Sequence, residues 1–330
     1  MNHAHHQPTD HNGHHSGDGP DLTHQEPRDH PTARPGPDDR PDLHREVAGT
    51  IALLTDTDDF TAMRRYRTFP YDDHHTYLHH LDALLTTRAA RGRHTTLALF
   101  DPDDYAAYCT DTGLDPDTPT TRGRYTAHLA ATTATVPYDG RPLSDLVPDL
   151  VNAAVRHATW EYATEALATL GPCPTCHDDI GWACYAHAGE LLLRILTSAG
   201  TGHHHLVCSV ATNDQTLLTA LRADTPAGAT VPDDIDPTEA QEFATLLALG
   251  IATKSGGGLV LRTAGRPDAQ DRVCGWRLDN GHLTALTASE VFDAYCTDAE
   301  SGDLLSPEPG LDYTPPPTLG TETPPPPHHH

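Results

Sequence analysis

Four side chains able to bind a metal ion fall within fifteen residues near the middle of the chain. Cys173 and Cys176 form a C-x-x-C pair, and Cys184 and His187 follow with the same spacing. A tetrahedral Zn²⁺ site needs four such ligands, and each short pair supplies two of them from one turn of the chain. In a helix, Cys184 and His187 share one face, because residues three apart are neighbours there. The pattern predicts a Cys₃His zinc site that holds a fold together without taking part in chemistry.

Two other interpretations of these cysteines stay open. A Cys-Pro-x-Cys motif also occurs as a redox pair, although redox pairs follow a strand at the start of a helix, and here Gly171-Pro172 ends a helical pattern just before the motif. The thiols also suit a plain structural role, since cysteine packs as a small apolar side chain. His177 and the run 203–205 are further candidates for the fourth zinc ligand.

Paired carboxylates form a second candidate site. Asp56-Thr57-Asp58-Asp59 and Asp101-Pro102-Asp103-Asp104 each follow a short apolar run. Carboxylates at the ends of adjacent parallel strands are able to hold Mg²⁺ for phosphoryl transfer. The same residues also suit helix N-termini: Asp56 and Asp101 as caps, Pro102 in the first position, and further acids beside the positive end of the helix dipole. The pattern favours capping over catalysis.

The segment Leu53-Leu54-Thr55-Asp56-Thr57-Asp58 resembles the first motif of haloacid-dehalogenase-type phosphatases. The resemblance implies that Asp56 is a nucleophile and Asp58 a general acid. The chain departs from that family at Asp59, where the family has Thr or Val. Its only lysine, Lys254, is poorly placed to hold a phosphate group.

The charge balance excludes several classes of partner. The chain has 47 acidic against 21 basic residues, with a formal net charge of -26. Such a surface repels polyanions, so we expect no nucleic-acid binding and no anionic-membrane surface. No apolar run is long enough for a membrane span or a signal peptide, and an odd count of seven cysteines does not favour a secreted disulfide framework. We therefore expect a cytoplasmic protein.

Composition and periodicity divide the chain into five segments. The His-rich residues 1–46 and the Pro-rich residues 301–330 have no apolar period and are predicted to be disordered. Residues 47–142 are predicted to form an α/β domain, residues 143–200 a helical hairpin with the zinc site at its turn, and residues 201–300 an α+β domain.

A βαβ repeat is expected in the α/β domain. The two apolar runs before the acidic groups predict strands, and the apolar spacing within 72–92 predicts a helix between them. A strand, a helix and a second strand imply two neighbouring parallel strands. A further short strand is predicted at 135–138.

The α+β domain is predicted to begin with strands and to end with a hairpin and a helix. Four strands are predicted, at residues 206–210, 217–221, 258–262 and 273–278. A helix is predicted over 238–251, and Lys254–Gly258 is interpreted as a hairpin connection. Asn280-Gly281 predicts a tight hairpin, because both residues tolerate positive φ. Thr287-Ala288-Ser289-Glu290 is a capping box that begins the last helix.

The chain as a whole resembles uncharacterised actinobacterial proteins of Streptomyces type over residues 47–300. Leu99-Phe100-Asp101-Pro102 and Ala294-Tyr295-Cys296-Thr297-Asp298 are the stretches on which the likeness rests, and it implies no activity. The sequence therefore predicts an accessory or protein-interaction protein with structural zinc. The alternative is a Mg²⁺-dependent phosphoesterase or nucleotide-processing enzyme that uses Asp56 and Asp101.

Overall fold

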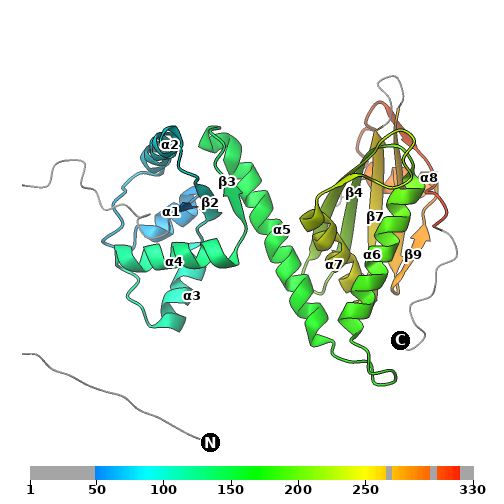
Figure 1. The fold of residues 1–330 in the computed structure, drawn as a ribbon, viewed down its shortest axis with the longest axis horizontal. Coiled ribbons are helices and arrows are strands. Elements are labelled where there is room, and N and C mark those ends of the chain that lie inside the picture. The colour runs from blue at the N-terminus through cyan, green and yellow to red at the C-terminus, as the bar shows by residue number, and fades with distance from the viewer. Residues whose placement is uncertain (1–48, 265–269, 298–302, 320–330) are drawn as a thin grey trace, which may run out of the picture. The chain divides into compact units, whose positions relative to one another are not determined.

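The structure is a computed structural model that describes residues 49–264, 270–297 and 303–319 (Figure 1). Within these residues the fold is mixed α/β, with eight helices and two sheets. The elements up to the long central helix are β1 (Thr50–Leu53), α1 (Thr57–Met63), α2 (His74–Ala90), β2 (Thr96–Leu99), α3 (Pro102–Thr112), α4 (Pro119–Thr132), β3 (Thr135–Pro137) and α5 (Leu143–Thr169). The elements that follow are α6 (Ile180–Ala199), β4 (Gly202–Ala211), β5 (Thr216–Thr225), β6 (Asp234–Ile235), α7 (Pro237–Thr253), β7 (Gly257–Ala264), β8 (Asp271–Asp279), β9 (His282–Ala285), α8 (Ala288–Tyr295) and β10 (Leu311–Tyr313). The predicted N-terminal tail, residues 1–46, lies outside the described residues.

A three-stranded sheet organises the first part of the fold. β1 and β2 are parallel, in a register that runs from Thr50 opposite Thr96 to Leu53 opposite Leu99, and β3 pairs antiparallel with β2. Both parallel strands are short apolar runs whose central residues are buried, and their side chains belong to one hydrophobic core. The expected βαβ repeat is confirmed.

The long helix α5 contributes to two separate hydrophobic cores. Its N-terminal half adds Leu143, Leu146 and Leu150 to the core over the three-stranded sheet. Its C-terminal half adds Ala163 and Leu167 to a second core, which packs against the larger sheet. A helix with a 27-residue span is long enough to serve both cores.

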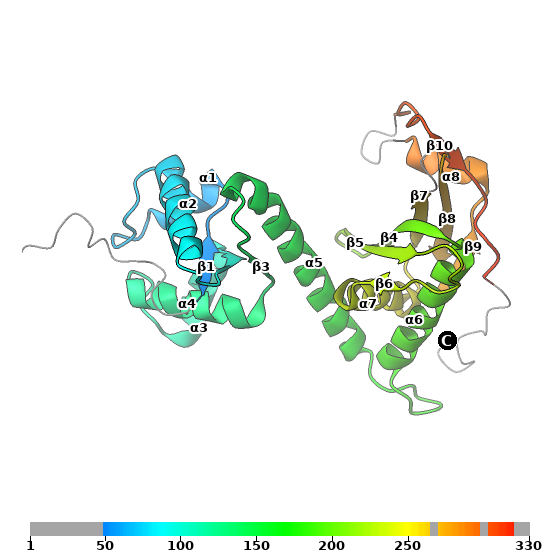
Figure 2. The ribbon, with the colours of Figure 1, turned by 45° about the horizontal axis from the view of Figure 1, so that its top comes forward.

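A seven-stranded sheet organises the second part of the fold. Its strand order is β10-β8-β7-β4-β5-β6, with β9 paired to β8, and all neighbours are antiparallel except β10 and β8. Figure 2 shows α6 and α7 along one face of this sheet. The predicted strands and helix are present, and Asn280 and Gly281 take positive φ in a two-residue hairpin between β8 and β9. The predicted capping box at Thr287 and Glu290 is also confirmed.

The connection Lys254–Gly258 differs from its sequence interpretation. It joins a helix to a strand and is not a β-hairpin. Lys254 is the left-handed C-cap of α7, with φ of 55°, and its N–H bonds to the carbonyls of Gly250 and Ile251. The chain then enters β7 at Gly257.

Part of the C-terminal segment departs from the prediction of disorder over 301–330. Leu311–Tyr313 forms β10, which pairs in parallel with β8. The Tyr313 ring contacts Phe292 edge-on, and Leu319 packs against the second core. Three residues are too few to show an alternating apolar pattern in the sequence. The strand forms because the edge of an existing sheet supplies its hydrogen-bond partners.

Candidate functional site

The C-x-x-C motif folds into a tight turn at the tip of the α5–α6 hairpin. The N–H of Cys173 donates to the carbonyl of Asp178 at 2.8 Å, and the N–H of His177 donates to the carbonyl of Cys173 at 2.9 Å. His177 has a positive φ of 65°. Backbone N–H groups of Cys176 and Thr175 point at the Cys173 sulfur and lower the pKa of that thiol. A sulfur surrounded by N–H donors is stabilised as a thiolate, which is the form that binds metal.

The other two predicted zinc ligands have different surroundings. Cys184 lies on α6 in the second hydrophobic core, where burial raises the pKa of its thiol. His187 is half-buried one turn further along α6. Within the described part of the chain, no three His, Cys, Asp or Glu side chains gather closely enough to hold a metal ion. The structure thus brings Cys173 and Cys176 together, and the complete four-ligand site stays a prediction.

An exposed tryptophan stands beside this turn. Asp179 caps α6 by accepting the N–H of Trp182 at 2.7 Å, and the Trp182 side chain is 69% exposed. Its ring lies 5.9 Å from that of Tyr185. Leu193, also exposed, follows three helical turns later and so shares the same side of α6. The sequence does not reveal this exposure, because an apolar residue in a helical pattern is ordinarily assigned to a core.

The first aspartate of each acidic group is a helix cap. Asp56 Oδ1 accepts the N–H groups of the second and third helical residues of α1 at 2.9 and 2.8 Å. Asp101 Oδ1 does the same for α3 at 2.7 and 3.1 Å. Pro102 occupies the first position of α3. The capping interpretation is therefore confirmed.

The two acidic groups also influence one another. Burial, and after it the charges of Asp56, Asp101 and Asp103, together raise the pKa of Asp59 to about 6. This proximity follows from the parallel pairing of β1 and β2, which brings their carboxyl ends to one edge of the sheet. None of the groups that shift this pKa is cationic, so the charges of the two acidic groups repel one another at Asp59.

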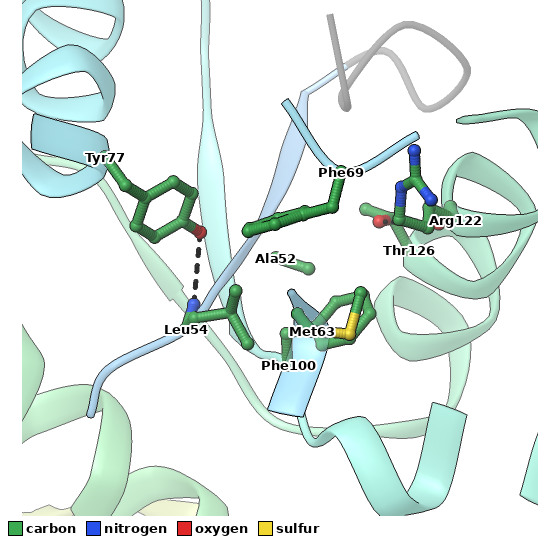
Figure 3. A pocket seen from close by; sticks show the side chains of 8 residues that line it. All are labelled: Ala52, Leu54, Met63, Phe69, Tyr77, Phe100, Arg122 and Thr126. Carbon is green, nitrogen blue, oxygen red and sulfur yellow. Dashed lines mark hydrogen bonds between the residues drawn. The ribbon is translucent and has the colours of Figure 1, made fainter. Parts of the chain in front are cut away.

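A small cavity lies at the carboxyl ends of β1 and β2 (Figure 3). Its lining residues are Ala52, Leu54, Met63, Phe69, Tyr77, Phe100, Arg122 and Thr126. Its volume is about 20 Å³, enough for one water-sized particle. The Tyr77 hydroxyl oxygen accepts the N–H of Leu54 at 3.2 Å. Arg122, on α4, is 2% exposed and is the only charged side chain of this lining.

A polar row crosses the open face of the larger sheet. The ladder places His205 of β4 between Arg222 of β5 and Arg262 of β7, and a cavity of about 460 Å³ lies over them. His203 Nδ1 lies 2.6 Å from a carboxylate oxygen of Asp224. Burial, together with the two arginines, lowers the pKa of His205.

The net positive charge of this row is smaller than its two arginines suggest. Arg262 forms ion pairs with Asp271 and Glu308. Its Nη2 lies 2.7 Å from Asp271 Oδ2 and 3.1 Å from Glu308 Oε1, so its charge is compensated. The side chains of histidines 203–205, which were further candidates for zinc, point alternately to the two faces of the sheet. His204 faces the core and bonds to the Gly200 carbonyl, whereas its two neighbours face outward.

Comparison with known proteins places part of the chain in a described family. Residues 38–141 match a family described as a domain of unknown function, DUF8829. The match covers less than half of the chain and includes β1 to β3 with α1 to α4. No curated protein and no solved structure matches the chain.

The helices give no sign of a membrane span. Across residues 49–264, 270–297 and 303–319, none combines the length and the apolar character that crossing a bilayer requires.

Proposed function

We propose that the chain is a cytoplasmic accessory protein that binds a partner protein through the α5–α6 hairpin, with Zn²⁺ stabilising the hairpin tip. The observation behind this proposal is the exposure of Trp182 directly after the Cys173–Cys176 turn. Tryptophan is the residue type most enriched among the side chains that dominate binding energy at protein interfaces. The backbone that carries this ring is fixed by a cap and a tight turn, so binding costs little backbone entropy.

Further large apolar side chains are exposed on both helices of the hairpin. Val151, Val155 and Tyr162 are exposed at helical spacing on α5, as Trp182 and Leu193 are on α6. Large apolar side chains that stay exposed on a folded surface are typical of protein interaction sites where they gather.

Acidic side chains accompany this apolar surface. Glu161 and Glu165 are exposed on α5, and Glu190 is exposed on α6. A partner with an apolar pocket and a basic rim would complement the hairpin in both respects.

Zinc is the group proposed to rigidify the tip. Cys173 and Cys176 fit a zinc half-site, because their sulfurs lie on one turn and N–H donors favour the thiolate of Cys173. Cys184 and His187 complete the proposed set. When bound, the ion would cross-link the loop to the first turns of α6 and fix the position of Trp182.

Site-specific photo-crosslinking tests the proposed interface. The photoreactive residue p-benzoylphenylalanine is placed at position 182 or 193 of the full chain, and at position 231 as control, because Val231 is also exposed and apolar but lies outside the hairpin. Positions 182 and 193 should capture the same protein, and position 231 should not. With that protein purified, Trp182→Ala should weaken binding by about tenfold or more. Equal capture from position 231, or unchanged affinity of Trp182→Ala, would refute the proposal.

The alternative proposal remains the Mg²⁺-dependent phosphoesterase or nucleotide-processing enzyme. Its support is the convergence of two acidic helix N-termini around Asp59. A phosphatase and nucleotide-hydrolysis screen with Mg²⁺ on wild type, Asp56→Asn and Asp101→Ser decides it. Activity that both substitutions abolish without loss of folding would favour this enzyme over the accessory protein.

A further inference from the structure

The guanidinium of Arg122 is a buried cation without an adjacent carboxylate. Its Nη2 donates to the carbonyl oxygen and the hydroxyl of Thr68, at 2.9 and 3.0 Å. Its Nε and Nη1 are buried and have no hydrogen-bond partner among the described residues. Removing an unpaired charge from water costs several kcal/mol in proteins, so this arrangement calls for a compensating group. Buried donors without partners likewise call for an explanation.

Neighbouring protein groups compensate the charge only in part. Asp117 reaches the guanidinium indirectly, since it accepts the N–H and the hydroxyl of Thr68 and is also paired with Arg67. The Tyr105 hydroxyl donates its hydrogen to the carbonyl of Pro116 at 2.7 Å, so its oxygen faces Arg122 as an acceptor and favours the charged form of the guanidinium, but this oxygen is neutral. Neither group provides a full negative charge at the free nitrogens.

The cavity beside Arg122 restricts what such a compensating group can be. Its volume of about 20 Å³ excludes phosphate, sulfate and carboxylate groups, but accepts one particle of the size of a water molecule. Apart from Arg122 and Thr126, its walls are apolar or aromatic, as Figure 3 shows. Such walls favour a weakly hydrated ion over a strongly hydrated one. The oxygen of Tyr77 already accepts an N–H, so its own hydrogen is left to donate.

We propose that this cavity is a binding site for a single monoatomic anion, chloride or bromide, held by the guanidinium of Arg122. The site belongs to the fold over β1 and β2 and is independent of the α5–α6 hairpin.

Thermal unfolding of the full chain in different sodium salts tests the proposal. Replacing gluconate by chloride, from about 1 to about 200 mM at constant ionic strength, should raise the unfolding midpoint by about 3 °C, because a ligand that binds only the folded state stabilises it. Bromide should act as chloride does, and sulfate should not. A shift that is the same in chloride and sulfate would overturn the proposal.

Two variants assign the effect to Arg122. Arg122→Met should remove the chloride-dependent shift, and it should still fold, because a buried cation is often replaced by an apolar side chain without loss of stability. Arg141→Met is the matched control, since Arg141 is an exposed arginine paired with Asp139 and Asp149. It should keep the shift. A shift that survives in Arg122→Met contradicts the site.

A measurement on the unaltered protein covers the case in which Arg122→Met fails to fold. Anomalous diffraction from crystals soaked in bromide should show a peak in hydrogen-bond contact with the guanidinium of Arg122. A bromide map without a peak in this cavity would also overturn the proposal.

Discussion

The hydrogen bonds of Asp56 and Asp101 determine what these two carboxylates are able to do. Each places one oxygen against two backbone N–H groups that a helix leaves without internal partners. A carboxylate held in this way stabilises its own helix, and any metal ion would have to compete with those N–H groups for it. The same residue types that suggest phosphoryl chemistry in the sequence therefore have a structural role in the fold.

Substitution of Asp101 separates a cap from a catalytic carboxylate. Ser caps a helix as well as Asp does, so Asp101→Ser should leave the free energy of unfolding nearly unchanged, whereas Asp101→Ala should lower it by about 1 kcal/mol. Urea denaturation of both variants measures the difference. Equal losses in the two variants would contradict the capping role.

Asp59 should make stability depend on pH in the direction opposite to that of a paired carboxylate. Its pKa of about 6 in the folded chain lies above the ordinary value of 3.8. Between these values the folded chain holds a proton that the unfolded chain has lost, so stability falls as pH rises through this window and stays lower above it.

Asp59→Asn tests this expectation. The variant should gain stability relative to wild type at pH 7, and the gain should shrink as pH falls below 4. Urea denaturation at the two pH values measures it, with Asp58→Asn as the control for loss of an acid from the same helical turn. If the gain in the free energy of unfolding were the same at both pH values, the charge of Asp59 would not destabilise the folded state.

Among the elements, α5 and α6 approach each other closely where Gly181 meets Leu167. A Cβ atom added at Gly181 would lie 2.7 Å from the carbonyl oxygen of Leu167, closer than packed atoms allow. Gly189, two turns later on the same helix, has open space where a Cβ would be. The glycine at 181 thus sets the distance between the two helices of the hairpin.

These two glycines make a matched pair of variants. Gly181→Ala should destabilise the fold by about 1 to 3 kcal/mol through overpacking, because the helices would have to separate. Gly189→Ala should stabilise it by up to about 1 kcal/mol, since Ala forms helix better than Gly does. Thermal or urea unfolding gives both values. If Gly181→Ala were as stabilising as Gly189→Ala, the close approach would be wrong.

Elements with strong local signals are the ones that the sequence predicts well. The apolar runs before Asp56 and Asp101 predict β1 and β2, and Asn280-Gly281 predicts the β8–β9 hairpin, because these signals arise within a few neighbouring residues. The capping box at Thr287 belongs to the same class.

Features that depend on distant residues are not visible in the sequence. β10 exists because β8 provides its hydrogen-bond partners. Arg122 is buried because α4 packs over the first sheet, yet an arginine in a helical pattern is ordinarily assigned to the surface. The exposure of Trp182 depends in the same way on which face of α6 meets the second core.

Considered as a whole molecule, the protein is dominated by its negative charge. A formal net charge of -26 repels phosphate backbones, and on the open face of the larger sheet Asp271 and Glu308 compensate Arg262. We expect no binding to DNA or RNA at ordinary salt. Electrophoretic mobility shift with labelled duplex and single strands checks this, and a salt-sensitive shift at low micromolar protein would contradict it.

We propose that the tip of the hairpin is a zinc-stabilised interaction element, and its zinc content is a direct test of that proposal. The full chain and the Cys173→Ser/Cys176→Ser double variant contain the same His-rich ends, so any zinc bound by those ends cancels in the difference. Cys109→Ser, which alters a buried thiol in the other core, is the control. Elemental analysis should find about one zinc ion fewer in the double variant than in wild type or in Cys109→Ser, together with a lower unfolding temperature. Equal zinc content and unchanged unfolding in the double variant would show that the hairpin tip holds no structural zinc.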